Sequence, residues 1–345
     1  EVFRCTYNDA ETITERMYEE QARELVAGGY AAAGYRRVHV DDCWQARERD
    51  ARGRLQANAT RFPSGIKALA SRLEQQGLGL ALYTDEGPET CAGYPGSQGH
   101  EVLDAETFAE WGATYLKVDG CTNDAKGLAR GYPLFGRALA RLGVELSCSW
   151  PAYLGDDEAA KPYLEMAAAG CRLWRNWDDV QCSYGSMLGV LDHFGDYSRF
   201  LAAAAPPGVW NDPDMVLAGN ACISLGEARM QLAAYCVLAA PLIMGNDLLS
   251  VPPEARELLL NEEMVAINQD AAGLKGWRHS PKGVTEVWVR PLQGGDLAVA
   301  VLHKGEAGGP PALVDVDLEE VGWPRGTAAR VRDAFARQDL GEATG

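Results

Sequence analysis

Short apolar segments alternate with amphipathic segments along most of the chain. Apolar residues at helical spacing predict helices over 13–25, 66–76 and 105–111. Short, mostly apolar runs between such segments predict buried strands. These strands are expected over 37–40, 77–83, 115–118, 144–148, 172–174 and 209–210. Helices that alternate with buried strands predict an α/β fold with a parallel sheet and helical crossovers.

Polar residues stand where each predicted strand ends. Asp41 and Asp42 follow the first strand, Asp85 the second and Asp119 the third. The later strand ends carry Ser149, Trp150, Arg175, Asp178, Asp179, Asp212 and Asp214. In a closed (β/α)8 barrel these ends meet on one face, where the active site lies, whereas in an open sheet they spread along an edge. Repeated acids at consecutive strand ends favour the barrel.

The pattern changes after residue 272. Alternating or β-branched runs, separated by glycine and polar residues, predict strands over 285–290, 296–301, 314–318 and 329–332. We therefore expect two domains, a (β/α)8 barrel over 1–271 and a small antiparallel β domain over 272–345. Few strands precede Gly345, so we expect this second domain to be incomplete.

Composition and charge exclude several classes of protein. The chain has 345 residues, is 47% hydrophobic and 23% charged, and carries a formal net charge of −17. These proportions are typical of a globular protein, and the negative charge repels the phosphates of nucleic acid. The apolar run 232–244 is interrupted by Pro241 and is too short to cross a bilayer, so no membrane insertion is expected.

The nine cysteines form no C-x-x-C pair, and the five histidines form no H-x-x-x-H pair, so no metal site is expected. So many cysteines favour disulfides together with some free thiols, and hence an oxidising compartment. Asn58, in an N-A-T triplet, is a glycosylation acceptor and also favours secretion.

The strand-end carboxylates suit the cleavage of a glycosidic bond, which needs one acid and an opposing carboxylate. Asp119 and Asp179 are the candidates, because Lys117 and Arg175 precede them and a nearby cation keeps a carboxylate ionised. Any one of these aspartates could instead cap the following helix. The full set, with aromatic residues between them, favours a sugar site. These aromatic residues are Trp44, Tyr83, Trp150, Tyr153 and Trp177.

At these positions the chain resembles glycoside hydrolase family 27, the α-galactosidases and α-N-acetylgalactosaminidases. The motifs that carry the resemblance are VDDCW (40–44), RFPSGI (61–66), TCAGYPG (90–96), LKVDGC (116–121), WRN (174–176), WNDPDM (210–215) and AINQD (266–270). The resemblance implies a retaining exo-glycosidase without metal or organic cofactor. Asp119 matches the nucleophile and Asp179 the acid/base. The positions that match sugar-binding residues are Asp41, Asp42, Tyr83, Cys91, Lys117, Ser149, Ala152, Tyr153, Arg175 and Met215.

Two small residues bear on the choice of substrate. The Ser149 and Ala152 positions resemble sites that hold Glu and Leu in the family's α-galactosidases. Smaller side chains leave room for an acetamido group at C2 of the sugar, so the resemblance favours terminal α-linked N-acetylgalactosamine (GalNAc) on glycolipids, glycoproteins or oligosaccharides. An α-galactosidase is the alternative, and a catalytically silent or truncated sugar-binding relative is another.

The resemblance also implies three disulfides, Cys5–Cys43, Cys91–Cys121 and Cys148–Cys171, and leaves Cys182, Cys222 and Cys236 as expected free thiols. It implies a lysosomal or secreted enzyme, and a homodimer is a candidate assembly. The family's first barrel strand has no counterpart here, so we expect a barrel whose first strand is missing from the chain, and the activity of these residues alone is an open question.

Overall fold

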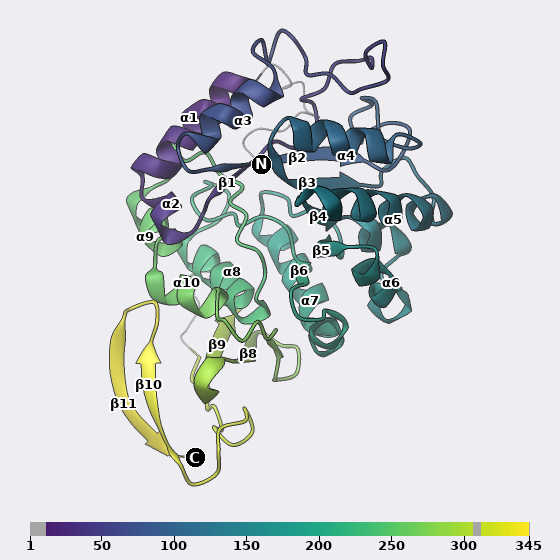
Figure 1. The fold of residues 1–345 in the computed structure, drawn as a ribbon. Coiled ribbons are helices and arrows are strands. Elements are labelled where there is room, and N and C mark those ends of the chain that lie inside the picture. Colours follow the sequence, from purple (N-terminus) through teal and green to yellow (C-terminus); the bar gives the residue numbers. More distant parts are fainter. Residues whose placement is uncertain (1–11, 306–311, 345) are drawn as a thin grey trace. The chain divides into compact units, whose positions relative to one another are not determined.

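A computed structural model describes residues 12–305 and 312–344 (Figure 1). The chain divides into two compact units. The first unit extends to Asp178 and also contains Asp247–Leu249. The second unit comprises Asp179–Asn246 and continues from Ser250.

The first unit is a parallel sheet in which neighbours in the chain are neighbours in space. Its strands are β1 (Arg37–His39), β2 (Gly79–Asp85), β3 (Ala113–Asp119), β4 (Glu145–Cys148) and β5 (Cys171–Arg175). Its α-helices are α1 (Glu15–Ala27), α2 (Tyr30–Ala33), α3 (Ile66–Glu74), α4 (Glu101–Glu110), α5 (Ala125–Leu142) and α6 (Tyr163–Ala168). Helices α3, α4 and α6 pack against the strands that follow them, as in crossover connections (Figure 1). The predicted alternation of helix and buried strand is therefore confirmed in this unit.

The strand register brings the carboxyl ends of β2 and β3 level with each other. Tyr83 pairs with Lys117, and Asp85 pairs with Asp119. Apolar side chains such as Leu82 on the same strands are buried, which anchors both strands in the core. Polar residues that are far apart in sequence therefore meet at one edge of the sheet.

The second unit begins with helices and one further strand. Its helices are α7 (Tyr184–Ala204), α8 (Leu225–Leu238), α9 (Pro253–Leu259) and α10 (Glu262–Asn268), and β6 (Trp210–Asp212) lies between α7 and α8 in sequence. Helix α8 starts with a capping box in which Ser224 and Glu227 each accept the other's backbone N–H. Within the described residues, no helix has the length and apolar character that a membrane crossing requires.

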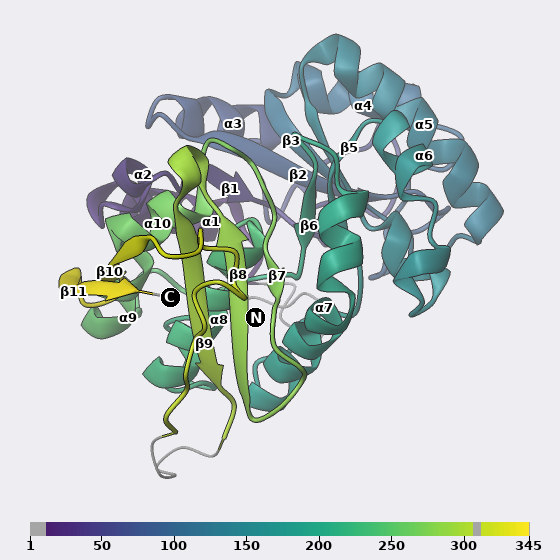
Figure 2. The same cartoon turned by 90° about the horizontal axis from the view of Figure 1, so that it is seen from below.

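The rest of the second unit is antiparallel. Strands β7 (Trp277–Arg278), β8 (Thr285–Pro291) and β9 (Leu297–His303) form one sheet, which Figure 2 shows side by side. Strands β10 (Ala328–Asp333) and β11 (Gln338–Thr344) form a separate hairpin. The predicted strand at 314–318 is wrong, because this segment is irregular. Its alternation reflects burial instead, since Val314 and Val316 pack against a small apolar cluster.

A buried arginine joins the antiparallel sheet to the helices of the second unit. Arg290 of β8 is 0% exposed. Its guanidinium donates to the carbonyl oxygens of Leu274, Cys236, Ile267 and Asn268 at 2.6–3.0 Å. Because carbonyls near the carboxyl ends of helices lack helical donors, this side chain adds hydrogen bonds to buried acceptors where α8 and α10 end.

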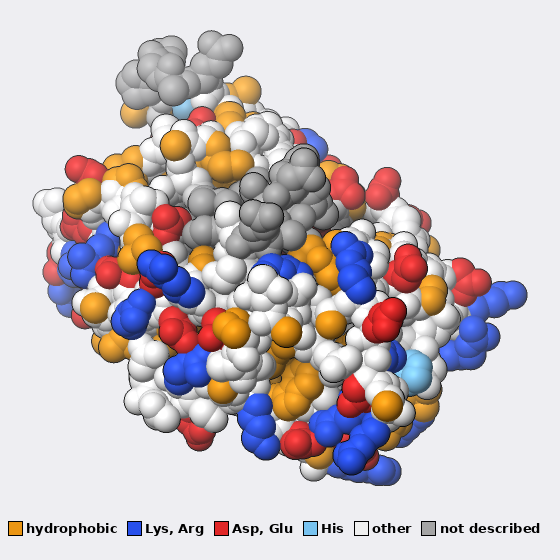
Figure 3. Space-filling model, turned by 90° about the horizontal axis from the view of Figure 1, so that it is seen from above, with side chains coloured by type: hydrophobic (Ala, Val, Ile, Leu, Met, Phe, Trp, Pro, Cys, Tyr) orange, Lys and Arg blue, Asp and Glu red, His pale blue; other side chains and the backbone are white. Residues whose placement is uncertain are grey.

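Charges of both signs share the molecular surface. On the face drawn in Figure 3, lysine and arginine side chains stand among aspartate and glutamate side chains. The net charge of −17 therefore does not form one continuous acidic field on this face.

Candidate active site

The strand-end aspartates of the first unit are not helix caps. The N-caps of the described helices include Thr14, Asp124 and Ser183, but none of Asp41, Asp42, Asp85 or Asp119. The alternative interpretation of these four carboxylates as helix caps is therefore wrong, and another reason must account for their position at the edge of the sheet.

Asp119, the expected nucleophile, lies at the last position of β3 and is 9% exposed. Its Oδ1 accepts hydrogen bonds from the Tyr153 hydroxyl at 2.6 Å and from the Gly120 N–H at 3.0 Å. Its Oδ2 lies 3.9 Å from Lys117 Nζ. Donors and a cation thus hold the carboxylate in one orientation.

Lys117 connects two carboxylates. Its Nζ donates to Asp41 Oδ2 at 2.8 Å and lies 5.1 Å from the centre of the Tyr83 ring. Burial alone would lower the pKa of Lys117, but Asp41 and Asp119 outweigh burial and raise that pKa above its usual value. Lys117 is therefore a permanent cation at this edge of the sheet.

The neighbouring Asp42 is fixed by backbone donors. Its carboxylate accepts from the N–H of Cys43 at 2.7 Å and from the N–H of Ala92 at 2.9 Å. Burial raises the pKa of Asp42, and the hydrogen bond from Ala92 opposes this shift. Asp41 is exposed and its carboxylate is held by Lys117 and by the Asp42 N–H, whereas the partly buried Asp42 is held by backbone donors.

A disulfide lies beside the nucleophile position. Cys91 and Cys121 are bonded, with Cα atoms 5.2 Å apart. The Tyr83 hydroxyl donates to Cys91 Sγ at 3.1 Å, and the Tyr153 hydroxyl lies 3.0 Å from Cys121 Sγ. The disulfide therefore contacts both tyrosines that were expected in the site.

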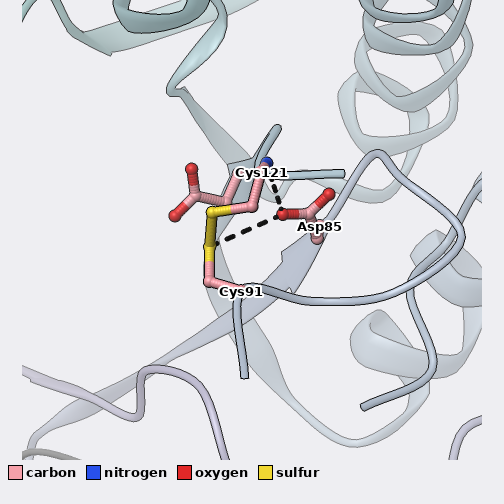
Figure 4. Close-up of side chains that lie close together, drawn as sticks. Asp85, Cys91 and Cys121 are labelled. Atoms are coloured by element: carbon pink, nitrogen blue, oxygen red, sulfur yellow. Dashed lines mark hydrogen bonds between the residues drawn. A yellow bond between two sulfur atoms is a disulfide. The ribbon is translucent and has the colours of Figure 1, made fainter. Parts of the chain in front are cut away.

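Asp85 is a residue that the resemblance did not include. Figure 4 shows its carboxylate pointing toward Cys121 and the Cys91–Cys121 disulfide. Asp85 Oδ2 accepts from the Cys121 N–H at 2.9 Å and lies 3.8 Å from Cys91 Sγ. Burial, and then the charge of Asp119, raises the pKa of Asp85 to about 7. Its position at the end of the second predicted strand was the sequence signal that could have identified it.

The donor set around Asp85 does not fit a metal ion in this state. Oxygen or sulfur atoms of Asp85, Cys91, Asp119 and Cys121 all lie within 4.8 Å of one another. The two sulfurs are bonded to each other, however, and metal ions bind cysteine as the thiolate. What remains is a pair of carboxylates.

Ser149 and Ala152 lie on the segment that also carries Tyr153. Ser149 follows β4 and precedes a 3-10 turn, Trp150–Leu154. Its N–H donates to the Val118 carbonyl at 3.0 Å, next to Asp119, and the Ala152 N–H donates to the Ser149 carbonyl at 3.0 Å. The backbone of the segment that carries the two small side chains is therefore held next to the strand end with the expected nucleophile.

The surroundings of this segment are rigid. Cys148 and Cys171 form a disulfide between β4 and β5, and the Trp150 ring stacks on Tyr132 with centroids 5.3 Å apart.

Of the five aromatic residues expected near a sugar, Trp44, Tyr83 and Trp150 are buried in the core. Only Tyr153 and Trp177 retain exposed area for stacking.

Arg175 lies at the carboxyl end of β5, at the edge of the sheet where Asp85 and Asp119 also lie. It is the last residue of β5, is 7% exposed, and donates to the carbonyls of Trp177 and Asp178 at 3.3 and 3.1 Å. The guanidinium thus shapes the chain directly before Asp179. Lys161 and Glu158 form a buried ion pair, and Lys161 also donates to the carbonyl of Asn176, the residue after Arg175, at 2.7 Å.

Asp179 and Met215 belong to the second unit and are held by its own contacts. Asp179 is exposed, and the next residue, Val180, donates its N–H to Asp214 Oδ2 at 2.8 Å. Gln231 of α8 donates to the Met215 carbonyl at 3.1 Å. The segments carrying the two residues are therefore each fixed by a buried side chain.

The prediction that Cys182 and Cys222 are free is wrong, because they form a disulfide with Cα atoms 5.5 Å apart. The segments before α7 and α8 approach each other in the fold, which their separation of 40 residues does not reveal. Cys236 is the free cysteine of the described residues and is buried. The predicted Cys5–Cys43 bridge lies outside the described residues, because residues 1–11 are not among them.

Known proteins and family models match this chain over most of its length. The family model described as alpha galactosidase A matches residues 2–270, and the model described as alpha galactosidase C-terminal beta sandwich domain matches residues 282–345. An α-N-acetylgalactosaminidase of Gallus gallus is 41% identical over 346 residues, covering 97% of this chain and 84% of that protein. Alpha-galactosidase A of Homo sapiens is 41% identical over 309 residues, covering 89% and 72%.

The likeness extends to solved structures. Alpha-galactosidase I of Mortierella vinacea superposes with a TM-score of 0.86 at 26% identity, covering 99% of this chain and 90% of that one. This protein is therefore a glycosidase with a catalytic barrel of the (β/α)8 type followed by an antiparallel β domain. The chain belongs to glycoside hydrolase family 27.

Proposed function

We propose that the chain is a retaining exo-α-N-acetylgalactosaminidase in which Asp119 is the nucleophile and Asp179 the acid/base. The choice of substrate rests on the small side chains of Ser149 and Ala152, whose segment is bonded through its backbone to Val118, next to Asp119. Overall similarity does not decide between the two activities of the family, because relatives named for each are 41% identical to this chain.

The proposed reaction proceeds by two displacements. Asp119 attacks the anomeric carbon while Asp179 gives its proton to the glycosidic oxygen, and the alcohol leaves. Asp179, now a carboxylate, takes a proton from water, whose oxygen attacks the same carbon and releases Asp119. Each step inverts the anomeric centre, so the product keeps the α configuration.

The side chains around Asp119 have distinct parts in this scheme. Tyr153 and Lys117 orient the Asp119 carboxylate by a hydrogen bond at 2.6 Å and a charge at 3.9 Å. Asp41 and Asp42 accept hydrogen bonds from the outer hydroxyls of the sugar. The family resemblance assigns Arg175, Tyr83, Cys91 and Met215 to sugar binding as well.

The substrate is tested by comparing aryl α-GalNAc with aryl α-galactoside. We expect kcat/KM to favour α-GalNAc by about 10-fold or more, because removal of a well-packed group costs roughly one to three kcal/mol. The double variant Ser149→Glu, Ala152→Leu should reverse this preference, since larger side chains fill the space of the acetamido group. A parent enzyme that prefers the galactoside would assign the chain to the α-galactosidases instead.

The nucleophile is tested separately. Asp119→Asn keeps the size of the side chain but removes its negative charge, so turnover of both substrates should fall by about 1,000-fold or more. Binding of free GalNAc, measured by calorimetry, should persist. A parent protein that binds GalNAc without hydrolysing it would be the silent sugar-binding relative.

The compartment, assembly and domains complete the proposal. Among the described residues, three disulfides fit an oxidising environment, and we propose a lysosomal or secreted enzyme with N-glycosylation at Asn58. If Asn58 carries a glycan, digestion with a glycosidase should lower the mass of the protein, and the variant Asn58→Gln should show no such loss. Light scattering would test for a homodimer.

The matched spans 2–270 and 282–345 support domains over 1–271 and 272–345.

A further inference from the structure

Asp85 makes contacts that no sugar-binding role requires. It is the last residue of β2, is 0% exposed, and pairs in register with Asp119 on β3. Both of its oxygens accept backbone N–H groups, Oδ1 from Gly87 at 2.6 Å and Oδ2 from Cys121 at 2.9 Å. A buried carboxylate is costly unless such donors satisfy it, so its retention here needs an explanation.

The bond from Cys121 acts on the turn that follows the nucleophile. Asp119, Gly120 and Cys121 are consecutive, and the Gly120 N–H donates to Asp119 Oδ1 at 3.0 Å. The Cys121 N–H, one residue further, is turned toward Asp85, and the Glu86 N–H donates to the Asp119 carbonyl at 2.8 Å. The end of β2 therefore holds the backbone of this turn on both sides of Gly120.

The same carboxylate also contacts the disulfide that supports the site tyrosines. Asp85 Oδ2 lies 3.8 Å from Cys91 Sγ (Figure 4). Cys121 Sγ lies 3.0 Å from the Tyr153 hydroxyl, which donates to Asp119. A shift of Asp85 would thus reach Asp119 along two routes, through the backbone turn and through the disulfide and Tyr153.

We propose that Asp85 is a positioning residue for the nucleophile, which aims the Asp119 carboxylate by fixing the turn 119–121 and the Cys91–Cys121 disulfide. This inference rests on the proposed function, in which Asp119 is the nucleophile. Asp85 itself does not touch the sugar. Loss of its two acceptor oxygens should therefore slow the attack of Asp119 more than it weakens substrate binding.

The first experiment compares two variants of β2 on an aryl α-GalNAc with a dinitrophenyl leaving group. Asp85→Asn places an amide N–H against a backbone N–H, and kcat should fall by about 10-fold to 100-fold with KM nearly unchanged. Thr84→Val is the matched control, because Thr84 is also fully buried on β2 but bonds to Ser97 Oγ at 2.7 Å, away from the turn. Its kcat should stay within about 2-fold of the parent.

The second experiment asks whether Asp85 acts through Asp119. In the Asp119→Ala background, azide replaces the carboxylate, attacks the anomeric carbon and expels the dinitrophenolate, giving the β-glycosyl azide. Adding Asp85→Asn to Asp119→Ala should change this azide-dependent rate by less than about 2-fold, because a nucleophile from solution needs no aiming. An equal loss in both backgrounds would overturn the proposal, since Asp85 would then act on the fold or the pocket.

Two further outcomes are distinct. Should Asp85→Asn fail to fold by circular dichroism, Asp85→Ser, which keeps one acceptor oxygen in less volume, is measured in both backgrounds with the same expectations. An unchanged kcat in a folded Asp85 variant overturns the inference alone. Full turnover by Asp119→Ala without azide overturns the proposed function and the inference together.

Discussion

The disulfide between Cys182 and Cys222 should contribute measurably to the stability of the second unit. Replacing both cysteines with alanine removes a cross-link that closes a loop of 40 residues. No other cysteine lies between these two positions, so no second cross-link shortens the loop. In the chain-entropy description, the cross-link restricts the unfolded chain and so raises its free energy. Removing the cross-link restores that freedom, and the free energy of unfolding should fall by about 4 kcal/mol for a loop of this size.

This free energy translates into a thermal shift. With the usual unfolding entropy per residue, the midpoint should fall by about 5 °C if the whole chain unfolds together and by about 10 °C if the second unit unfolds alone. Calorimetry of the parent and of the double variant Cys182→Ala, Cys222→Ala measures the shift, and peptide mapping confirms that Cys91–Cys121 and Cys148–Cys171 persist.

The matched control is Cys236→Ala, which removes a buried free thiol without opening a loop. Its cost should be about 1 kcal/mol, the value of one small buried group. A double variant whose midpoint lies within about 1 °C of the parent would refute the reasoning, because the cross-link would then restrict no freedom in the unfolded chain.

Three further predictions concern charged residues. Lys117→Met removes the cation between Asp41 and Asp119, so kcat/KM should fall by about 100-fold or more while circular dichroism stays unchanged. Arg290→Lys cannot reach all four carbonyl acceptors, so urea unfolding should show a loss of about 2–4 kcal/mol. Burial, and then the charge of Glu101, raises the pKa of Glu86 from 4.5 to about 9. The folded state therefore keeps a proton that the unfolded state releases, and stability should fall as pH rises through this window, less steeply in Glu86→Gln.

Each of these predictions has a contrary result. Near-parental kcat/KM in Lys117→Met would show that the cation does not act on Asp119. Arg290→Lys with parental stability would mean that other donors satisfy the freed carbonyls. If the thermal midpoints of the parent and Glu86→Gln change equally between about pH 5 and about pH 8, Glu86 does not bind the extra proton.

The periodicity of the sequence was sufficient for the parallel strands of the first unit. Each strand is a short apolar run between amphipathic segments. Because these strands are buried on both faces, nearly all their residues are apolar, and the run can be recognised without knowing which strands it pairs with. The periodicity was misleading at 314–318, where Val314 and Val316 pack against a cluster that includes Val287 and Val289 of β8, although the segment itself is irregular. The polar segment of β11 was missed because its backbone pairing with β10 leaves no apolar pattern in its side chains.

Some residues of the candidate site could be predicted from the sequence, whereas other contacts depend on how the strands pair. Asp119, Lys117 and Tyr153 could be proposed from motifs, and the structure brings them together at one edge of the sheet. Asp85 carries the same strand-end signal, but its contact with Cys121 depends on the register of β2 with β3. Sequence spacing contains no information on that register.

The sequence by itself determined the residue types, the order of helix and strand, and the motifs that place the chain in its family. Those properties are local, because they depend on side-chain chemistry and on periods of a few residues. Only the tertiary structure decided that Cys182 bonds to Cys222, that Arg290 meets four carbonyls, and that Asp85 bonds to the turn that follows Asp119. These contacts join segments that are distant in the chain, and the packing of the folded chain, rather than any local preference, brings their atoms within bonding distance.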